Sequence, residues 1–252
     1  MTLCRALVVG ESWVTHSIHQ KGFDSFTTTE YVEGGGRLIA ALQAGDVEVD
    51  YMPAHVAMRD FPDTAEALRA WDCIVISDIG ANSLLLHPDT FNRSVPRPNR
   101  LEALATYVRE GGGVVMVGGY LTFQGIEAKG CWRGTPVEEV LPVTLEPFDD
   151  RCERPDGVVA QVTGSHAVTD QVHGEWPALL GYNRLTARPT SQVLATVGDD
   201  PLLVVGSAGQ GRSVAFASDC SPHWAPPAFM DWEHYERLWS QMIIWAAGTG
   251  AR

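Results

Sequence analysis

The sequence predicts a single α/β domain, over residues 1–252, built around a doubly wound and mainly parallel β-sheet. Within the first 125 residues, apolar runs typical of buried strands alternate four times with helical segments. A glycine triplet at 111–113 separates the last of these helices from the last of these strands, where a glycine C-cap belongs. The second half holds short strands joined by tight turns, which favours antiparallel hairpins that extend the sheet.

The elements of the first half follow from the spacing of apolar residues. The runs CRALVVG and CIVIS fit buried strands, and Leu38, Ile39 and Leu42 recur at helical spacing. We expect a long loop after the first strand, which carries His16 and His19. In chain order, the expected strands are 4–10, 47–52, 73–77 and 114–117, and the expected helices are 34–44, 65–71 and 101–110.

The second half is expected to contain four short strands and one long helix. The turns GDDP (198–201) and SAGQG (207–211) separate apolar runs. The final segment, 234–247, places Leu238, Met242 and Trp245 on one helical face, so it should pack against the sheet. The expected strands are 158–162, 192–197, 202–205 and 212–217.

The composition excludes several classes of partner. Eighteen Lys and Arg residues against 31 Asp and Glu residues give a formal charge of −13, and such a surface repels nucleic acids and anionic membranes. No apolar run approaches the length of a membrane span or of a signal-peptide core. The five cysteines are irregularly spaced, which favours reduced thiols in the cytoplasm.

Polar and aromatic residues follow the predicted parallel strands. In open α/β sheets, ligands bind outside the carboxyl ends of the strands, where variable loops and helix N-termini meet. We therefore expect a site for a small polar molecule at this edge. The segments at these strand ends are GESW (10–13), SDIGAN (77–82), GGYLTFQ (118–124) and SDCSPHW (218–224).

These segments resemble a known family. GGYLTFQ aligns without gaps on the elbow G-x-C-x-G-x-Q of class I glutamine amidotransferases, and VAFASD (214–219) resembles that family's late strand ending in H-P-E. With KGFD (21–24) and GYN (181–183), the set is similar to the glutamine amidotransferase-like cytoplasmic proteins, distant relatives of the ThuA-like trehalose-utilisation proteins. The resemblance spans nearly the whole chain. It implies a flavodoxin-like three-layer α/β/α sandwich of the class I glutamine amidotransferase type, with an antiparallel hairpin extension in the C-terminal half.

The resemblance also implies that the glutaminase machinery is missing. It puts Tyr120 at the place of the nucleophilic cysteine, Ala217 at that of the histidine and Asp219 at that of the glutamate. A phenol, with a pKa of about 10, is a poor acyl-transfer nucleophile at neutral pH, and no histidine stands ready to activate it. Glutamine hydrolysis would therefore need Cys220 to reach into the same pocket.

The candidate catalytic residues are Tyr120, Asp78, Asp219 and His223. Either aspartate would act as the base, and Tyr120 or His223 as the acid. Each has a structural alternative, because an aspartate after a strand often caps the next helix and a buried tyrosine often packs with its hydroxyl satisfied. The candidate substrate-binding residues are Glu11, Trp13, His16, His19, Asn82, Gln124 and Trp224.

No cofactor is predicted. His16, His19 and His223, together with nearby carboxylates, are ligand types of a zinc or manganese centre. The H-x-x-H spacing is weak evidence by itself, because no HExxH or CxxC signature accompanies it. A divalent metal is therefore a minority hypothesis, and solvated loop histidines are the simpler interpretation.

The sequence leaves the function open between an enzyme and a binding protein. The leading hypothesis is acid–base chemistry, as a hydrolase, lyase or isomerase, on a small polar metabolite that the ThuA-like resemblance implies is carbohydrate-derived. A catalytically inactive amidotransferase fold, kept for ligand binding or assembly, comes second, a metal-dependent hydrolase third and a working glutaminase last. The tryptophans near the C-terminus further predict a homo-oligomer; these are Trp232, Trp239 and Trp245.

Overall fold

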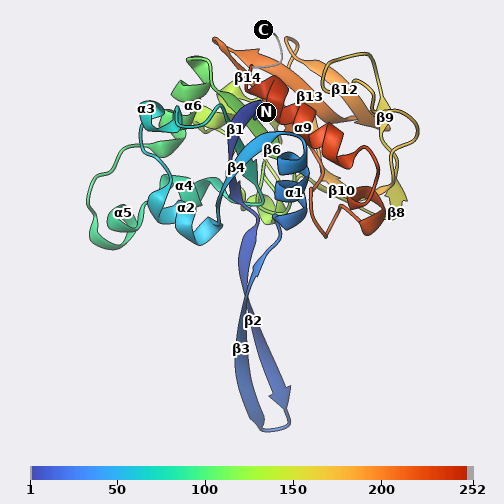
Figure 1. Ribbon diagram of the computed structural model, residues 1–252. Coiled ribbons are helices and arrows are strands. Elements are labelled where there is room, and N and C mark those ends of the chain that lie inside the picture. Colours follow the sequence, from blue (N-terminus) through green and yellow to red (C-terminus); the bar gives the residue numbers. More distant parts are fainter. Residues whose placement is uncertain (1, 249–252) are drawn as a thin grey trace.

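The computed structural model describes residues 2–248, and its centre is one eight-stranded sheet in the order β4-β1-β5-β6-β14-β13-β12-β9 (Figure 1). Its first five strands pair in parallel. β5 and β6 lie in the middle with every residue buried, because helices cover both faces of the sheet. The parallel core is confirmed. Its strands are β4 Val47–Met52, β1 Cys4–Gly10, β5 Cys73–Ser77, β6 Gly113–Val117 and β14 Gly211–Phe216.

The antiparallel extension of the C-terminal half is also confirmed. From β14 the sheet continues through β13 Asp200–Ala208, β12 Gln192–Val197 and β9 Gln161–Val162. The expected strand at 158–162 is wrong in its bounds, because the chain breaks into two strands there. Two small ribbons pair β8 Arg151–Val158 with β10 Leu179–Asn183, and β7 Val143–Leu145 with β11 Leu185–Ala187.

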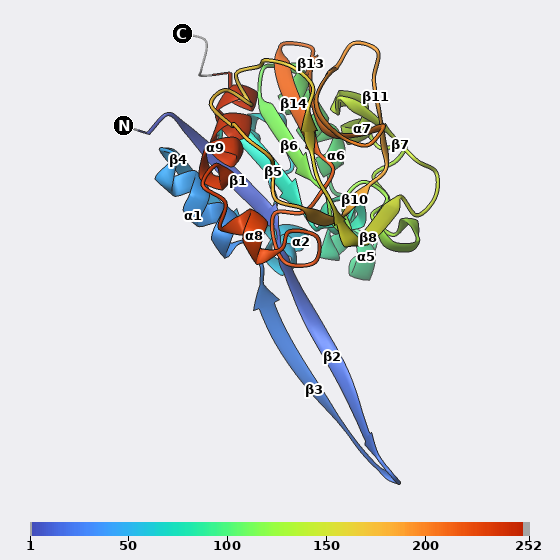
Figure 2. The ribbon, with the colours of Figure 1, turned by 90° about the vertical axis from the view of Figure 1, so that its right-hand side faces the viewer.

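Helices form the outer layers of the sandwich (Figure 2). α1 and α9 pack against each other on one face of the sheet, and α6 packs with α3 and α7 on the other. No helix among residues 2–248 is long and apolar enough to cross a membrane. The helices are α1 Gly36–Ala44, α2 Ala54–Asp60, α3 Ala65–Leu68, α4 Ala81–Leu85, α5 Pro88–Arg93, α6 Arg100–Arg109, α7 Pro136–Val140, α8 Pro227–Met230 and α9 Tyr235–Ala246, with a 3-10 turn at Ile126–Ala128.

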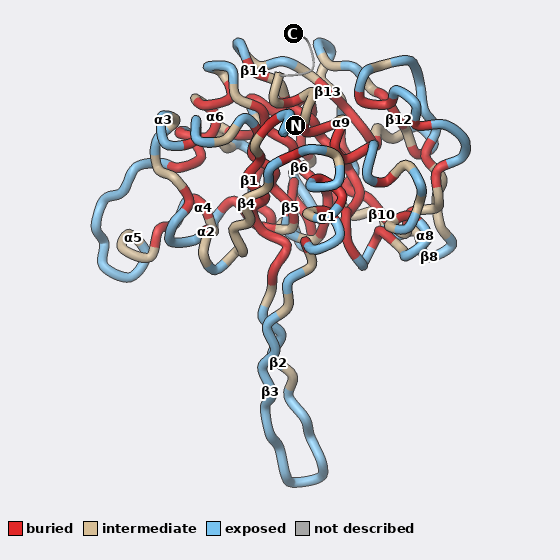
Figure 3. The backbone as a smooth tube through the Cα atoms, in the orientation of Figure 1, coloured by how far each residue is buried: buried red, intermediate tan, exposed pale blue. Residues whose placement is uncertain are grey.

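The segment after β1 was expected to be a loop, and this expectation is wrong. It forms a long antiparallel hairpin, hereafter the arm, of β2 Ser12–Lys21 and β3 Asp24–Glu33. The arm projects from the carboxyl edge of the sheet into solvent (Figures 1 and 3). Its local signals are the threonine-rich run 27–29, which favours extended backbone, and Gly22, whose φ of 63° allows the tight turn.

Arg100, the first residue of α6, is a buried cation that ties three helices together. Its side chain is 2% exposed and donates hydrogen bonds to the carbonyls of Ala57 and Met58 in α2 and of Ser83 and Leu84 in α4. Burial lowers the pKa of Arg100. The buried guanidinium is therefore hydrogen-bonded to backbone carbonyls and not to a carboxylate.

Candidate functional site

Three carboxylates meet at the carboxyl edge of the parallel sheet. Glu11 follows β1, Asp78 follows β5 and Asp219 lies three residues after β14. Glu11 and Asp219 are 0% and 2% exposed, whereas Asp78 is half-buried. Glu11 and Asp78 have φ angles of 47° and 41°, a left-handed conformation that costs about 1–2 kcal/mol for such residues. Strain of this kind persists where the surrounding structure holds a side chain in place, and it clusters at functional sites.

Hydroxyl groups and a thiol surround the Glu11 carboxylate. Ser77 Oγ donates to Oε1 and Ser221 Oγ donates to Oε2 at 3.0 Å. Cys220 Sγ lies 3.6 Å from Oε1. The donor atoms of Glu11, Asp219 and Cys220 all lie within 4.8 Å of one another. The strand ends thus bring two carboxylates together in a site that is closed to solvent.

Burial raises the pKa of Glu11, and the nearby charge of Asp78 adds to that rise. Burial raises the pKa of Asp219 well above its usual range, and the charges of Glu11 and Asp78 add to it. Two adjacent buried carboxyl groups do not both ionise readily, because the second negative charge would form beside the first in a region of low dielectric constant. We interpret Glu11 and Asp219 as a pair that holds a proton at neutral pH.

Cys220 does not occupy the place of an elbow nucleophile. Its thiol contacts Ser77 and Glu11 below the elbow, and burial raises the pKa of the Cys220 thiol well above its usual range. A protonated thiol is a poor nucleophile and a poor metal ligand. The donor atoms of Glu11, Asp219 and Cys220 are nevertheless close enough to share a cation, and a bound cation would lower the pKa values of all three groups.

The elbow after β6 is held by side chains that occupy its backbone amides. Leu121 N donates to Asp78 Oδ1 at 2.9 Å, and Gly119 N donates to Asn183 Oδ1 at 2.9 Å. Asp150 accepts from the amides of Gln124 and Gly125 at 2.9 and 2.8 Å. An oxyanion site for acyl transfer needs free amides beside the apex. Here the amide that follows the apex already binds a carboxylate.

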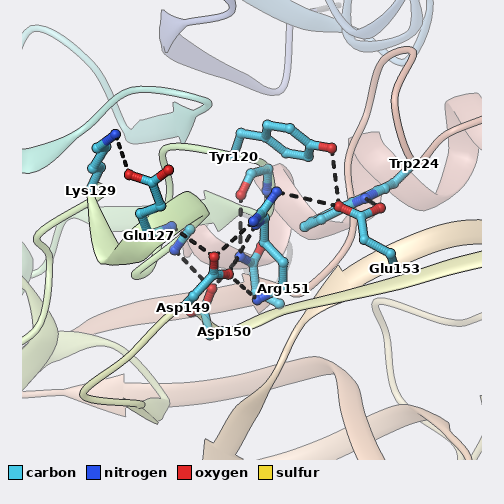
Figure 4. A network of polar contacts seen from close by, with 11 residues as sticks. Tyr120, Glu127, Lys129, Asp149, Asp150, Arg151, Glu153 and Trp224 are labelled. Carbon is cyan, nitrogen blue, oxygen red and sulfur yellow. Dashed lines mark hydrogen bonds and ion pairs between the residues drawn. The ribbon is translucent and has the colours of Figure 1, made fainter.

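Tyr120, at the apex, belongs to a polar and aromatic cluster on the outer side of the elbow (Figure 4). Its hydroxyl donates to Glu153 Oε1 at 3.0 Å, and the guanidinium of Arg151 lies 5.0 Å from the ring centroid. The His223 ring stacks on Tyr120 with centroids 4.8 Å apart and an interplanar angle of 9°. Burial and the hydrogen bond to Glu153 raise the pKa of Tyr120, so the phenol keeps its proton at neutral pH.

The structure brings together six of the residues predicted for the site. Trp13 extends the aromatic cluster, with its ring centroid 6.5 Å from that of His223. His223 is exposed and Trp13 is half-buried, so both offer ring surface to a ligand. Beneath them lie the elbow and the carboxylates. The six residues are Glu11, Trp13, Asp78, Tyr120, Asp219 and His223.

Two other predicted residues support the site from inside the protein. Trp224 is 1% exposed, and its indole nitrogen donates to Glu153 Oε2 at 3.0 Å. Gln124 is 7% exposed, and its side-chain oxygen accepts from the amide of Arg133. The Trp224 ring and the Gln124 amide group are buried and hydrogen-bonded inside the protein. Neither residue therefore presents the free surface that a substrate contact needs.

Three predicted residues lie elsewhere. Asn82 is exposed on α4, where it lines an apolar groove of about 260 Å³ with Met58 and Phe91. His16 and His19 lie on the exposed arm, hydrogen-bonded to Thr29 and Thr28. Within the chain, His16 and His19 therefore do not join His223 in one ligand set.

A comparison with known protein families identifies the family of this chain. Residues 5–247 match the family described as putative glutamine amidotransferase (GATase1-like). The chain belongs to this family. A search of functionally curated proteins gave no match.

Solved structures agree with this GATase1-like assignment. The chain is 50% identical to the cytoplasmic protein STM1381 from Salmonella typhimurium LT2, with a TM-score of 0.93 and coverage of 96% of this chain and 99% of the other. It is 45% identical to the cytoplasmic protein STM3548 from Salmonella typhimurium, also with a TM-score of 0.93, covering 96% and 98%. A putative ThuA-like protein from Parabacteroides merdae shares the fold at 12% identity, with a TM-score of 0.60, covering 97% and 90%.

Sequence reasoning missed the side chains that hold the GATase1-like elbow in place. Asn183 was quoted only as part of GYN, yet its amide nitrogen donates to Asp150 at 2.7 Å while its oxygen fixes Gly119. Arg151 and Glu153 reach Tyr120 from β8, more than 30 residues away in the sequence. No local pattern marks these residues, because their roles depend on pairing between distant segments. The glycine–tyrosine–asparagine run after an apolar stretch was the one available signal.

Proposed function

We propose that the protein is an enzyme that uses acid–base chemistry, as a hydrolase, lyase or isomerase, on a small, polar, carbohydrate-derived metabolite. The observation that carries this proposal is the position of Asp78. It is the half-buried member of the carboxylate group, next to the Tyr120–His223 stack and above the protonated pair. The site thus combines a reachable base, an exposed imidazole and aromatic surface.

Asp78 is the proposed general base. Burial raises its pKa, and the Leu121 amide and His223 oppose that rise. A carboxylate whose pKa is raised towards neutrality removes a proton more readily from a weakly acidic substrate. His223 is the proposed acid, because an imidazole can donate a proton near neutral pH. His223 stacks on Tyr120, and Asp78 accepts the amide of Leu121, the next residue along the elbow, which supports assigning the acid and the base to one site.

Tyr120 and Trp13 are the proposed binding residues. The protonated phenol of Tyr120 can donate to a substrate oxygen in exchange for Glu153. Trp13 and His223 offer ring faces to the apolar side of a sugar-like ring. Glutamine hydrolysis is not part of the proposal, because the apex is a tyrosine and Asp78 occupies the adjacent amide.

The proposed location is the cytoplasm. All five cysteines are free, and both highly similar Salmonella structures are described as cytoplasmic proteins. Reduced thiols, two of them buried in strands, suit a reducing compartment.

A ligand-binding protein without catalysis is the second candidate. The observation in its favour is that Asn183, Asp78 and Asp150 saturate the elbow amides, which stabilises the turn and leaves no oxyanion site. Such a protein would bind its ligand through Trp13 and His223 and would release it unchanged.

The test is a turnover screen with purified protein. Aldoses, ketoses, sugar acids and sugar lactones are incubated with the wild type and with Asp78→Asn, and the products are followed by NMR. We expect one compound to be converted by the wild type and at least 100-fold more slowly by Asp78→Asn, since general-base catalysis is worth about 10²–10⁴-fold.

The control is Asp156→Asn, which changes an exposed carboxylate on β8 and should retain wild-type turnover. Compounds that raise the melting temperature of wild type without being converted would favour the binding candidate. Turnover that needs a stoichiometric metal and stops with chelator would replace the proposal by a metal-dependent hydrolase. Ammonia release from glutamine that is lost in Cys220→Ser would restore the glutaminase.

A further inference from the structure

The arm exposes apolar side chains along a ribbon that projects from the body into solvent. Ile18 is 77% exposed and Phe23, at the turn, is fully exposed. Val14, Phe26 and Tyr31 are also exposed, and residues 18–31 are all exposed, as the pale blue backbone of the outer arm shows (Figure 3). An isolated two-stranded hairpin is marginally stable in water, and contiguous apolar surface of this kind marks an interaction site.

The root of the arm is fixed to the body, so its direction is set by the fold. Ser12 Oγ accepts the amide of Ala54 at 2.8 Å, and Gly34 N donates to Glu11 O at 2.7 Å. The Tyr31 ring packs edge-on against His55 of α2, with centroids 5.2 Å apart. A projecting element that is held at its base loses little conformational entropy when a partner binds.

Three exposed apolar side chains of the arm, Val14, Ile18 and Tyr31, lie on one face, whereas Phe26 lies on the other face, where it stacks on His19. Strand residues alternate between faces, so Val14, His16 and Ile18 point the same way, and the cross-strand pairing adds Tyr31 to that face opposite Val14. We call this set the apolar face. The outer half of the arm, from Ile18 to its cross-strand partner Thr27, has one lysine, one aspartate and one histidine, whereas the whole chain carries −13.

We propose that the apolar face of the arm packs against the arm of a second copy of this chain, in a symmetric dimer. Two strongly acidic bodies repel each other, and the near-neutral outer arm is the segment through which two copies can approach. A two-fold arrangement is self-complementary, so each apolar face meets its own equivalent and the assembly closes. Strands of ten residues make the ribbon about 33 Å long, which keeps the bodies apart.

In this dimer the two arms run in opposite directions, so the turn of one arm reaches the root of the other. Phe23 of one copy then lies near the root residues Val14 and Tyr31 of its partner. The C-terminal tryptophans are not needed for the contact: Trp239 is buried in the core, and Trp232 packs on Trp176 and Phe229. The homo-oligomer is thus proposed again, but with the arm as its interface.

The experiment is sedimentation equilibrium of the full chain at 1–100 µM. We expect wild type to be a dimer and the double variant Val14→Asp/Ile18→Asp to be a monomer, with dimerisation weakened at least 100-fold. Both side chains lie outside the core, so the unfolding transition of the body should persist. Phe91→Asp, an equally drastic change at a 73% exposed residue on α5, is the matched control and should stay dimeric.

A shortened arm gives an independent test if the double variant aggregates. Replacement of residues 16–29 by Asn-Gly closes the hairpin after the Thr15–Glu30 pair and should also give a folded monomer. A monomeric wild type at 100 µM would overturn the proposal, including one that sediments with lipid vesicles or binds another protein through the arm. A dimer that survives both arm variants would overturn it as well.

Discussion

Arg100 and the Glu11–Asp219 pair are both buried ionisable groups, yet their surroundings act on them in opposite ways. Arg100 is surrounded by four backbone carbonyls at the ends of α2 and α4, so its buried charge faces matching dipoles. Glu11 and Asp219 face each other, with hydroxyls and a thiol around Glu11. The surroundings of Arg100 stabilise its charge, whereas the contact between Glu11 and Asp219 disfavours a second negative charge.

The difference indicates which site is structural and which is available for chemistry. A cation whose donors are all directed at helix ends stabilises the fold. A buried carboxylate pair with raised pKa values costs stability once it ionises, and such pairs are found where a protein stores or transfers protons.

The largest effect is expected for Arg100→Ala. It leaves the carbonyls of α2 and α4 without the donors of Arg100 and opens a cavity, so the free energy of unfolding should fall by about 3–5 kcal/mol, since each unsatisfied buried acceptor costs about 1–3 kcal/mol. Urea unfolding followed by circular dichroism measures it. Arg100→Lys keeps the charge and should lose less. If Arg100→Ala costs under about 1 kcal/mol, the carbonyl cage does not stabilise the fold.

The carboxylate pair should show itself in the pH dependence of stability. Because burial raises the pKa of Asp219 in the folded state, the folded protein binds more protons than the unfolded chain above about pH 4. The stabilisation that protonated Asp219 provides is complete below the pKa of an aspartate in the unfolded chain. It is lost as the pH rises through the pKa of Asp219 in the folded state, by up to about 1.4 kcal/mol per pH unit for each proton that the folded protein retains.

Asp219→Asn removes this proton uptake. The variant should show a flatter stability profile between pH 5 and 9 and should be more stable than wild type by about 1–2 kcal/mol at pH 8. The gain should shrink in a Glu11→Gln background, because groups that share a proton are not additive. Parallel profiles for wild type and Asp219→Asn would mean that the pair is ionised in the folded state.

The contrast between Arg100 and Glu11 also shows what the sequence could reveal. The sheet followed from apolar runs such as CIVIS, because strand burial is written in consecutive residues. The positions of Glu11, Asp78 and Asp219 at one edge followed from parallel topology. Their burial did not, since it depends on Ser221 and Cys220, which lie more than 200 residues from Glu11.

The arm was missed for a different reason. Its strands bury almost nothing within the chain, so the apolar alternation that marks a half-buried strand is weak, and polar residues such as His16, Ser17 and Gln20 looked like a loop. Arg100 was not singled out either, because an arginine at a helix start is ordinary and only the tertiary fold surrounds it with carbonyls. Features that arise from distant partners, or from partners outside the chain, leave little local pattern.

The smallest effect on stability is expected for Tyr120→Phe, because Tyr120 lies on the exposed side of the site, unlike Arg100 and the Glu11–Asp219 pair. The lost hydrogen bond joins Tyr120 to Glu153, whose side chain is 50% exposed, so water can replace it and the free energy of unfolding should change by under about 1 kcal/mol. The stack on His223 and the contact with Arg151 use the ring and survive the change. If Tyr120 orients substrate while Asp78 and His223 transfer protons, Tyr120→Phe should raise KM more than it lowers kcat and leave the pH profile of kcat in place. A loss of kcat at unchanged KM would instead make the phenol the acid, and His223 would then be the binding residue.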